Sequence, residues 1–245
     1  MGELINMEIA GTGKIPGGTF GDVNISGMGK IVGDVKGKNL NVAGMGSAIK
    51  DINFDNINIA GTFKSSGIVS VNDKITINGT AKINAFEGND IEVNGTATIA
   101  EGMKFNKATV NGRAKVAGDC EGNIFSCNGS ISVGGLLSAD RIDINLRGRC
   151  TAKDVGGEEI TIKNDSCVTV KVLGISCEFW QLKKEFKCES IEGDKIYLEN
   201  TICEIVRGEN IVIGKGCKIN KVEYYGTLKK EDGSIVIKEE CLSKS

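Results

Sequence analysis

Short segments in which two apolar residues flank one polar residue recur along the chain at a nearly constant interval. Such alternation places every second side chain on the same face of a β-strand. The ten apolar pairs are Met7/Ile9, Val23/Ile25, Leu40/Val42, Ile57/Ile59, Ile75/Ile77, Ile91/Val93, Ala108/Val110, Phe125/Cys127, Ile142/Ile144 and Ile160/Ile162. A glycine follows each of the first eight pairs, and successive glycines lie 16 to 18 residues apart. The chain therefore reads as a repeat of short strands and tight turns.

Each repeat contains the alternation more than once. In one repeat it occurs three times, as Ile91/Val93, Ala97/Ile99 and Met103/Phe105. Three short strands joined by bends close into a triangular coil, and each coil buries its apolar side chains only when other coils stack on it. We therefore predict an all-β fold, a right-handed parallel β-helix (a triangular solenoid) with three short strands per coil of about 17 residues.

The rhythm changes in two places. Residues 173–190 hold the only Trp of the chain, two Phe and a cluster of Lys, without strand-like alternation. Residues 223–233 interrupt the pattern again, and an Asp-Gly pair within them is typical of a hairpin turn. We predict a regular β-helix over 1–172, an irregular aromatic and basic insertion over 173–190, and continuing coils over 191–245 with a hairpin near 223–233. Two shorter β-helical lobes separated by the insertion are the alternative.

Composition agrees with many short strands and turns. The chain has 34 Gly and one Pro, and its apolar fraction of 40% is sufficient for a core. Its net charge of −2 creates no overall field that would attract nucleic acid. No window approaches about 18 uninterrupted apolar residues, and the N-terminus lacks the pattern of a secretion signal, so we expect a cytoplasmic protein. Nine Cys without CxxC spacing are expected to be reduced thiols packed in the core.

The familiar chemistries of stacked β-coils lack their residues in this sequence. Hexapeptide acyltransferases and trimeric carbonic anhydrases need His as a base or zinc ligand, and this chain has no His. The clustered acidic calcium ligands of polysaccharide lyases do not stand out, and no phosphate loop of nucleotide-binding proteins is found. We therefore predict no catalytic, cofactor-binding or metal-binding residues, no bound nucleotide and no enzymatic activity.

The repeat unit from Ile77 to Ile83 (INGTAKI) resembles the bactofilins, a family of polymer-forming bacterial cytoskeletal proteins. The resemblance covers about residues 5 to 170, and the stretches 133–142 (VGGLLSADRI) and 222–228 (VEYYGTL) look like those of a longer subgroup from spore-forming bacteria. It implies a right-handed β-helix that polymerises end to end without nucleotide, often at the inner face of the cell membrane. It also implies a scaffold role in cell shape, envelope synthesis or motility. Many bactofilins carry an N-terminal tail with a membrane signal, whereas regular coils begin here within ten residues.

The two ends of such a solenoid expose unpaired strand edges and core side chains, which either capping or stacking has to cover. No amphipathic capping helix is evident in the sequence. We therefore predict that the terminal coils bind neighbouring copies of this chain or of a paralogue, and the alternative is a monomer capped by its own loops. The predicted polymer interface consists of Leu4, Ile5, Met7, Ile9, Ile235, Ile237 and Leu242.

Charged residues recur in register with the turns. Three residues after turn glycines come Lys14, Lys30, Lys64, Lys82 and Lys115, and the same register reaches Arg149. Acidic residues about seven positions after the glycines are expected on another face: Asp34, Asp51, Glu87, Glu101 and Asp119. Segregated columns are suited to side-by-side bundling or to contact with anionic lipid, whereas charges that only keep strands from sticking are the plainer interpretation.

The insertion supplies one more predicted surface. Aromatic and basic side chains together are typical of a peripheral membrane contact or a partner contact, and packing onto the solenoid is the alternative. The residues concerned are Phe179, Trp180, Lys183, Lys184, Phe186 and Lys187. The sequence favours a structural polymer first, a non-polymerising β-helical adaptor that presents its faces to protein or membrane partners second, and a carbohydrate-active enzyme third.

Overall fold

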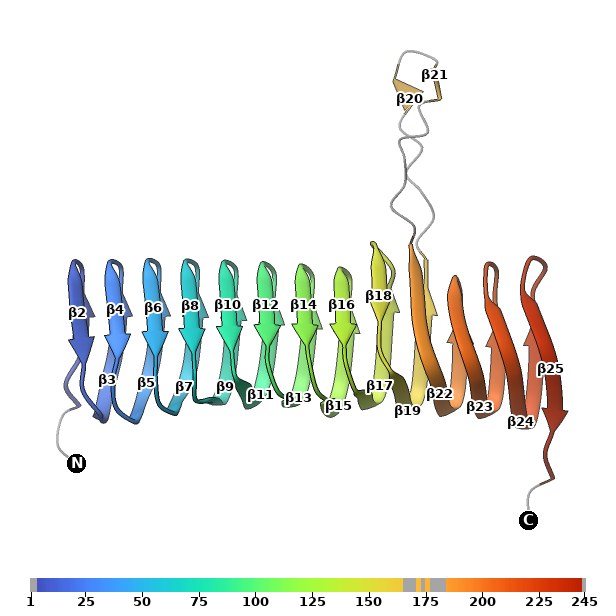
Figure 1. Ribbon diagram of the computed structural model, residues 1–245, viewed down its shortest axis with the longest axis horizontal. Helices are drawn as coiled ribbons and strands as arrows, with labels where there is room; N and C mark the ends of the chain where they lie inside the picture. The colour runs from blue at the N-terminus through green and yellow to red at the C-terminus, as the bar shows by residue number, and fades with distance from the viewer. Residues whose placement is uncertain (1–3, 165–170, 173–174, 177–183, 244–245) are drawn as a thin grey trace.

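The structure, a computed structural model, describes residues 4–164, 171–172, 175–176 and 184–243, and this part of the chain is all β (Figure 1). Short and long strands alternate along the chain and wind into a stack of about 13 coils. In Figure 1 the strands nearest the viewer run downward while the chain advances from left to right, which is the right-handed sense. The predicted class, an all-β parallel β-helix, is confirmed.

Two kinds of strand build the regular coils that follow β1 (Met7–Ile9). The short strands are β2 (Thr12–Ile15), β4 (Met28–Ile31), β6 (Met45–Ala48), β8 (Thr62–Ser65), β10 (Thr80–Ile83), β12 (Thr96–Ile99), β14 (Arg113–Val116), β16 (Ser130–Val133) and β18 (Arg149–Thr151). The long strands are β3 (Gly18–Ile25), β5 (Val35–Val42), β7 (Ile52–Ile59), β9 (Ile68–Ile77), β11 (Ala85–Val93), β13 (Met103–Val110), β15 (Cys120–Cys127), β17 (Leu136–Asn145) and β19 (Asp154–Lys163).

Each coil has three faces, because every long strand bends in the middle. We call the face of the short strands face A, that of the first half of each long strand face B, and that of the second half face C. In β7 the buried side chains are Ile52 and Phe54 on face B and Ile57 and Ile59 on face C. The step of three between Phe54 and Ile57 marks the bend, where pairing with β9 also shifts in register. The three strands per coil expected from the sequence correspond to these three faces.

Parallel pairing keeps the apolar residues in register from coil to coil. On face C, Met7 pairs with Val23, and the same column runs through Ile160 and Ile196 to Ile211. The inward side chains of all three faces form one continuous core along the axis. Each coil is therefore stabilised by the coils directly above and below it.

The corner between faces C and A needs glycine because the coils stack closely there. A Cβ on Gly112 would lie 2.1 Å from the carbonyl oxygen of Gly95 in the preceding coil. The asparagines before these glycines hydrogen-bond along the axis: Asn94 Nδ2 donates to Asn78 Oδ1, and Asn111 Nδ2 donates to Asn94 Oδ1, both at 2.9 Å. These three amides form a short ladder along the axis.

The last coils consist of three longer strands, β22 (Glu185–Leu198), β23 (Thr201–Ile213) and β24 (Lys218–Lys230), followed by the shorter β25 (Ile235–Cys241). β19 and β22 are parallel neighbours in the main sheet, with Ile160 opposite Ile196. The segment of the chain that connects β19 to β22 contains β20 (Lys171–Val172) and β21 (Ile175–Ser176), which pair antiparallel with each other. β22 begins at Glu185, so the last six residues of the predicted insertion 173–190 belong to the coil.

The hairpin predicted near 223–233 is wrong. β24 and β25 pair in parallel, with Lys218 opposite Ile235. The turn at Asp232 and Gly233, where Gly233 has a φ of +85°, is a coil corner. After this turn β25 stacks on the first half of β24 and does not fold back along its second half. The chain therefore begins another coil.

Candidate assembly and contact surfaces

The first coil exposes apolar side chains beside an open strand edge. Leu4 is exposed, and Ile5 retains 70% of its accessible surface. The carbonyl oxygen of Ile5 accepts a hydrogen bond from Gly21 N at 2.9 Å, so this segment is seated on the second coil. Met7 and Ile9 of β1 are partly buried against the core. Among the described residues β1 pairs with β3 alone, and its other edge faces the end of the rod.

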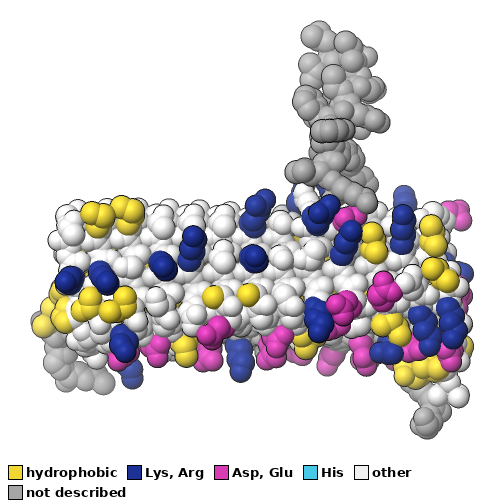
Figure 2. Space-filling view, in the orientation of Figure 1, with side chains coloured by type: hydrophobic (Ala, Val, Ile, Leu, Met, Phe, Trp, Pro, Cys, Tyr) yellow, Lys and Arg dark blue, Asp and Glu magenta, His cyan; other side chains and the backbone are white. Residues whose placement is uncertain are grey.

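The last coil has the same character. Ile235 and Ile237 of β25 are exposed, Ile237 at 75%, and Leu242 is partly exposed. β25 covers β24 only from Lys218 to Tyr224, so the second half of β24 lies at the open end. Figure 2 shows hydrophobic side chains gathered at both ends of the rod. Both ends thus combine open backbone edges with apolar side chains, which are the features that end-to-end contact requires.

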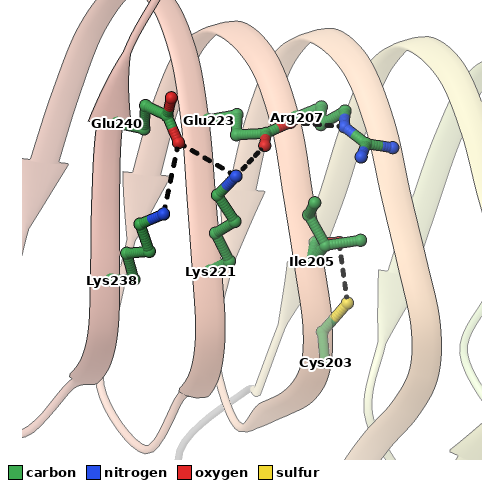
Figure 3. A network of polar contacts seen from close by, with 7 residues as sticks. All are labelled: Cys203, Ile205, Arg207, Lys221, Glu223, Lys238 and Glu240. Carbon is green, nitrogen blue, oxygen red and sulfur yellow. Dashed lines mark hydrogen bonds and ion pairs between the residues drawn. The ribbon is translucent and has the colours of Figure 1, made fainter.

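A chain of ion pairs ties the last three coils together on face B (Figure 3). Arg207 Nε of β23 donates to Glu223 Oε2 of β24 at 2.5 Å, and Lys221 Nζ donates to the other oxygen of Glu223. Lys221 also lies 2.9 Å from Glu240 Oε2 of β25, and Lys238 Nζ lies 3.6 Å from the same oxygen. The exposed end strand is therefore held on the solenoid by charge as well as by backbone pairing.

The Glu223 carboxylate makes the stability of these coils depend on pH. Lys221 and then Arg207 hold the pKa of Glu223 below its ordinary value of 4.5. A group whose pKa is lower in the folded state stabilises the fold above its unfolded pKa, and this stabilisation is lost as pH falls through the folded pKa. We expect the thermal midpoint of the wild type to drop between pH about 5 and about 3, and Glu223→Gln to flatten this dependence. The exposed residue Glu121, changed to Gln, is the matched control, and equal pH profiles for both variants would refute the assignment.

The five predicted lysines form one column on face A. Lys14 lies opposite Lys30, and Lys64 lies opposite Lys82. Lys115 continues the column. In the coils that have no lysine at this position, the residue is Ser47, Thr98 or Ser132. All five lysines are exposed, and Figure 2 shows a row of basic side chains across the face of the short strands.

Arg149 was predicted in this column, and that prediction is wrong. Thr151 pairs with Ser132 and takes the position instead. Arg149 follows Ile144 by five positions, whereas the corresponding step in the preceding coil is three. The corner is longer because Leu146 within it is fully buried in the core. A period counted along the sequence cannot register such an extra core residue.

Four of the five acidic residues lie at the corner between faces A and B, Glu87 lies within β11, and the five do not form a single column. Asp34, Asp51 and Asp119 share one register, whereas Glu101 lies one position earlier and Glu87 two positions later. Asp51 and Asp119 each accept a hydrogen bond at 2.8 Å from a backbone N–H of the next coil. These carboxylates therefore also fix the geometry of the corner.

The predicted contact residues of the insertion separate into three groups. Phe179, Trp180 and Lys183 lie outside the described residues. Lys184 is partly buried, and Lys187 is exposed with Nζ 3.4 Å from Glu185 Oε1. Phe186 is fully buried, and its predicted role as a membrane or partner contact is wrong. The alternation of β22 turns Phe186 into the core, where its strand position pairs with Cys150.

The described cysteines are free thiols. Five of them are buried: Cys120, Cys127, Cys150, Cys203 and Cys217. Burial raises the pKa of Cys217 to about 11, so this thiol stays protonated at neutral pH. These residues act as small apolar core residues, as their spacing in the sequence indicates.

Two further kinds of site are absent from the described residues. Within this part of the chain no three His, Cys, Asp or Glu side chains come together as metal ligands. The same residues contain no helix with the length and apolar character needed to cross a membrane.

Comparison with known proteins gives two partial relatives from Bacillus subtilis (strain 168). The chain is 34% identical to the uncharacterized protein YhbF over 91 residues, and this matched segment covers 37% of this chain and 34% of YhbF. It is 32% identical to the uncharacterized protein YhbE over 97 residues, and this matched segment covers 38% of this chain and 38% of YhbE. The match thus spans about a third of these relatives. No family model matches the chain, and no solved structure matches it. The β-solenoid itself is compatible with a structural or scaffold role.

Proposed function

We propose that this protein is a structural scaffold that assembles end to end into filaments without nucleotide. The observation that carries the proposal is the state of the two ends, where open strand edges lie beside Ile5 at one end and Ile237 at the other. A second copy placed on either end would extend the parallel stack at its spacing of about 4.8 Å and bury these side chains.

The partner in this proposal is another copy of the chain or a paralogue with the same coil. Stacking adds backbone hydrogen bonds on three faces at once, so a contact of modest area gains directional interactions. The resemblance of the repeat to bactofilins supports the same function. In this proposal the protein is not an enzyme and binds neither nucleotide nor nucleic acid.

Sedimentation of the purified chain in nucleotide-free buffer tests the proposal. The monomer has a mass of 25.9 kDa, and we expect most of the protein in species many times larger. Dilution should release the monomer, because end contacts depend on concentration. A single 25.9 kDa species at concentrations up to about 100 µM, where contacts of micromolar affinity would be saturated, would contradict the proposal.

A non-polymerising adaptor is the second candidate, and the side of the rod favours it. Met28 and Met45 are exposed next to each other on face A, in register with each other and flanked by Lys14 and Lys30. Exposed methionines are adaptable contact residues for a protein partner. An adaptor would remain a single rod in solution and would lose its partner on replacement of Met28 and Met45 by Ser.

A further inference from the structure

The two ends of the rod are aligned with each other, because the same columns of residues run through the whole stack. On face C the column that contains Met7 in the first coil passes through Ile211 to Leu228. The next position on the same strands forms a second column, from Glu8 to Lys229. A second copy set on the C-terminal end in the same orientation would therefore pair β1 in parallel with the second half of β24, with Met7 over Leu228.

The outward residues of these two open edges have opposite charges. Glu8 and Lys229 are exposed, and among the described residues neither takes part in an ion pair. With β1 stacked on β24 the two side chains would lie directly opposite each other, where opposite charges attract. A contact between two like ends would instead bring two Glu8 or two Lys229 side chains to one interface, where like charges repel.

The inward residues of the last coil include a charged pair. Lys230 continues the column of the buried residue Ile213, and Glu239 continues that of the buried residue Val222. The two columns belong to faces C and B, yet the side chains meet, with Lys230 Nζ 2.5 Å from Glu239 Oε1. The pair therefore lies over the end of the core.

The first coil leaves room for this pair. The column of Glu239 begins at Gly18, and every residue between these two is apolar. Gly18 thus has no side chain at the position where a stacked copy would meet the Glu239 carboxylate. An apolar side chain there would press on the charged group and shield it from water, which is unfavourable. The N-terminal end is therefore a better partner for the C-terminal end than a second C-terminal end would be.

We propose that copies of this chain join head to tail, with the N-terminal end of one rod on the C-terminal end of the next, so that the filament has a direction. The inference rests on the proposed function, because it specifies how the end contacts are made. In this joint Glu8 pairs with Lys229, and the charged pair of the last coil lies under Gly18. Burying a paired charge adds little net affinity, so that pair selects the partner end more than it strengthens the joint. A contact between two different surfaces repeats without closing, as a filament requires.

Exchange of the two outward charges tests the joint, with pelleting by ultracentrifugation as the measurement. Glu8→Lys and Lys229→Glu each place like charges opposite each other, and we expect each to raise the concentration for half-maximal pelleting about fivefold. The double variant Glu8→Lys/Lys229→Glu restores opposite charges and should lie within about twofold of the wild type. Glu121→Lys changes an exposed carboxylate on the side of the rod and is the matched control, which should assemble like the wild type.

Cysteine crosslinking identifies which ends meet. Glu8→Cys and Lys229→Cys, one of them isotope-labelled, are mixed under assembly conditions and treated with a short bismaleimide. Mass spectrometry of the linked peptides then separates the engineered links from those of native cysteines. We expect links between position 8 of one copy and position 229 of another.

Three results would overturn the head-to-tail joint while leaving end-to-end assembly intact. These are links between two copies of position 8 or of position 229, unchanged pelleting in both single variants, and a double variant that assembles no better than the single variants. A wild type that does not pellet would overturn the joint together with the proposed function. Circular dichroism of each variant checks that the single rod remains folded.

Discussion

Replacing Phe54 with alanine is expected to lower the free energy of unfolding by about 3 to 5 kcal/mol. The ring is fully buried on face B and lies over Gly37 of the preceding coil, where an added Cβ would come within 2.5 Å of it. Gly37 has no side chain that could collapse into the space, so the cavity should persist. Urea denaturation followed by circular dichroism measures the loss.

The exposed residue Met45, changed to Ala, provides the control and should shift stability by no more than about 0.5 kcal/mol. Because each coil contacts only its neighbours, hydrogen exchange should rise first in the coils around β7. A loss below about 1 kcal/mol for Phe54→Ala would contradict the assignment of this ring to the core.

Replacing Ile5 or Ile237 with lysine is expected to abolish sedimentable assemblies. Each substitution places an ammonium group at an end where a neighbour would bury the side chain, and an unpaired buried charge is strongly unfavourable. The side chains are 70% and 75% exposed, so the fold of the single rod should be unaffected. Pelleting by ultracentrifugation, with circular dichroism as the check on folding, measures the effect.

Ile124 offers a matched control, because it is an exposed isoleucine on the side of the rod. Ile124→Lys should assemble like the wild type. Unchanged pelleting in both end variants would show that these ends do not form the contact. Loss of assembly in Ile124→Lys as well would point instead to contacts between the sides of rods.

The fold could be predicted because the sequence repeats the same local requirement in every coil. A pair such as Ile57/Ile59 can be buried only between equivalent pairs, so the period of the pattern is also the period of the structure. The lysine column from Lys14 to Lys115 was placed correctly for the same reason. Where the number of residues per coil is constant, residues one period apart in the sequence are neighbours in the stack.

The errors lie where local cues compete with stacking. Phe186 was grouped with the aromatic composition of its neighbours, although it occupies a strand position of β22 opposite the core residue Cys150. The Asp232-Gly233 pair favours a hairpin locally, but β25 pairs with β24 in parallel, so the turn is a corner of the coil. Tertiary pairing decides both cases.

The charged clusters were missed because they exist only across coils. Arg207, Glu223 and Glu240 lie 16 and 17 residues apart, which is the coil period, and this spacing was a signal available in the sequence. Lys230 and Glu239 lie on different faces of the coil and meet only over the end of the core. The only mark of the two-residue lengthening in the sequence is Leu146, which follows Asn145 at the place where the preceding corners have a glycine.

End-to-end assembly is tested most directly by negative-stain electron microscopy of the purified chain in buffer without nucleotide. The account predicts unbranched filaments many times longer than one stack of about 13 coils and no wider than the rod, unless rods lie side by side. Fields of separate short rods at concentrations above those of the sedimentation assay would contradict it.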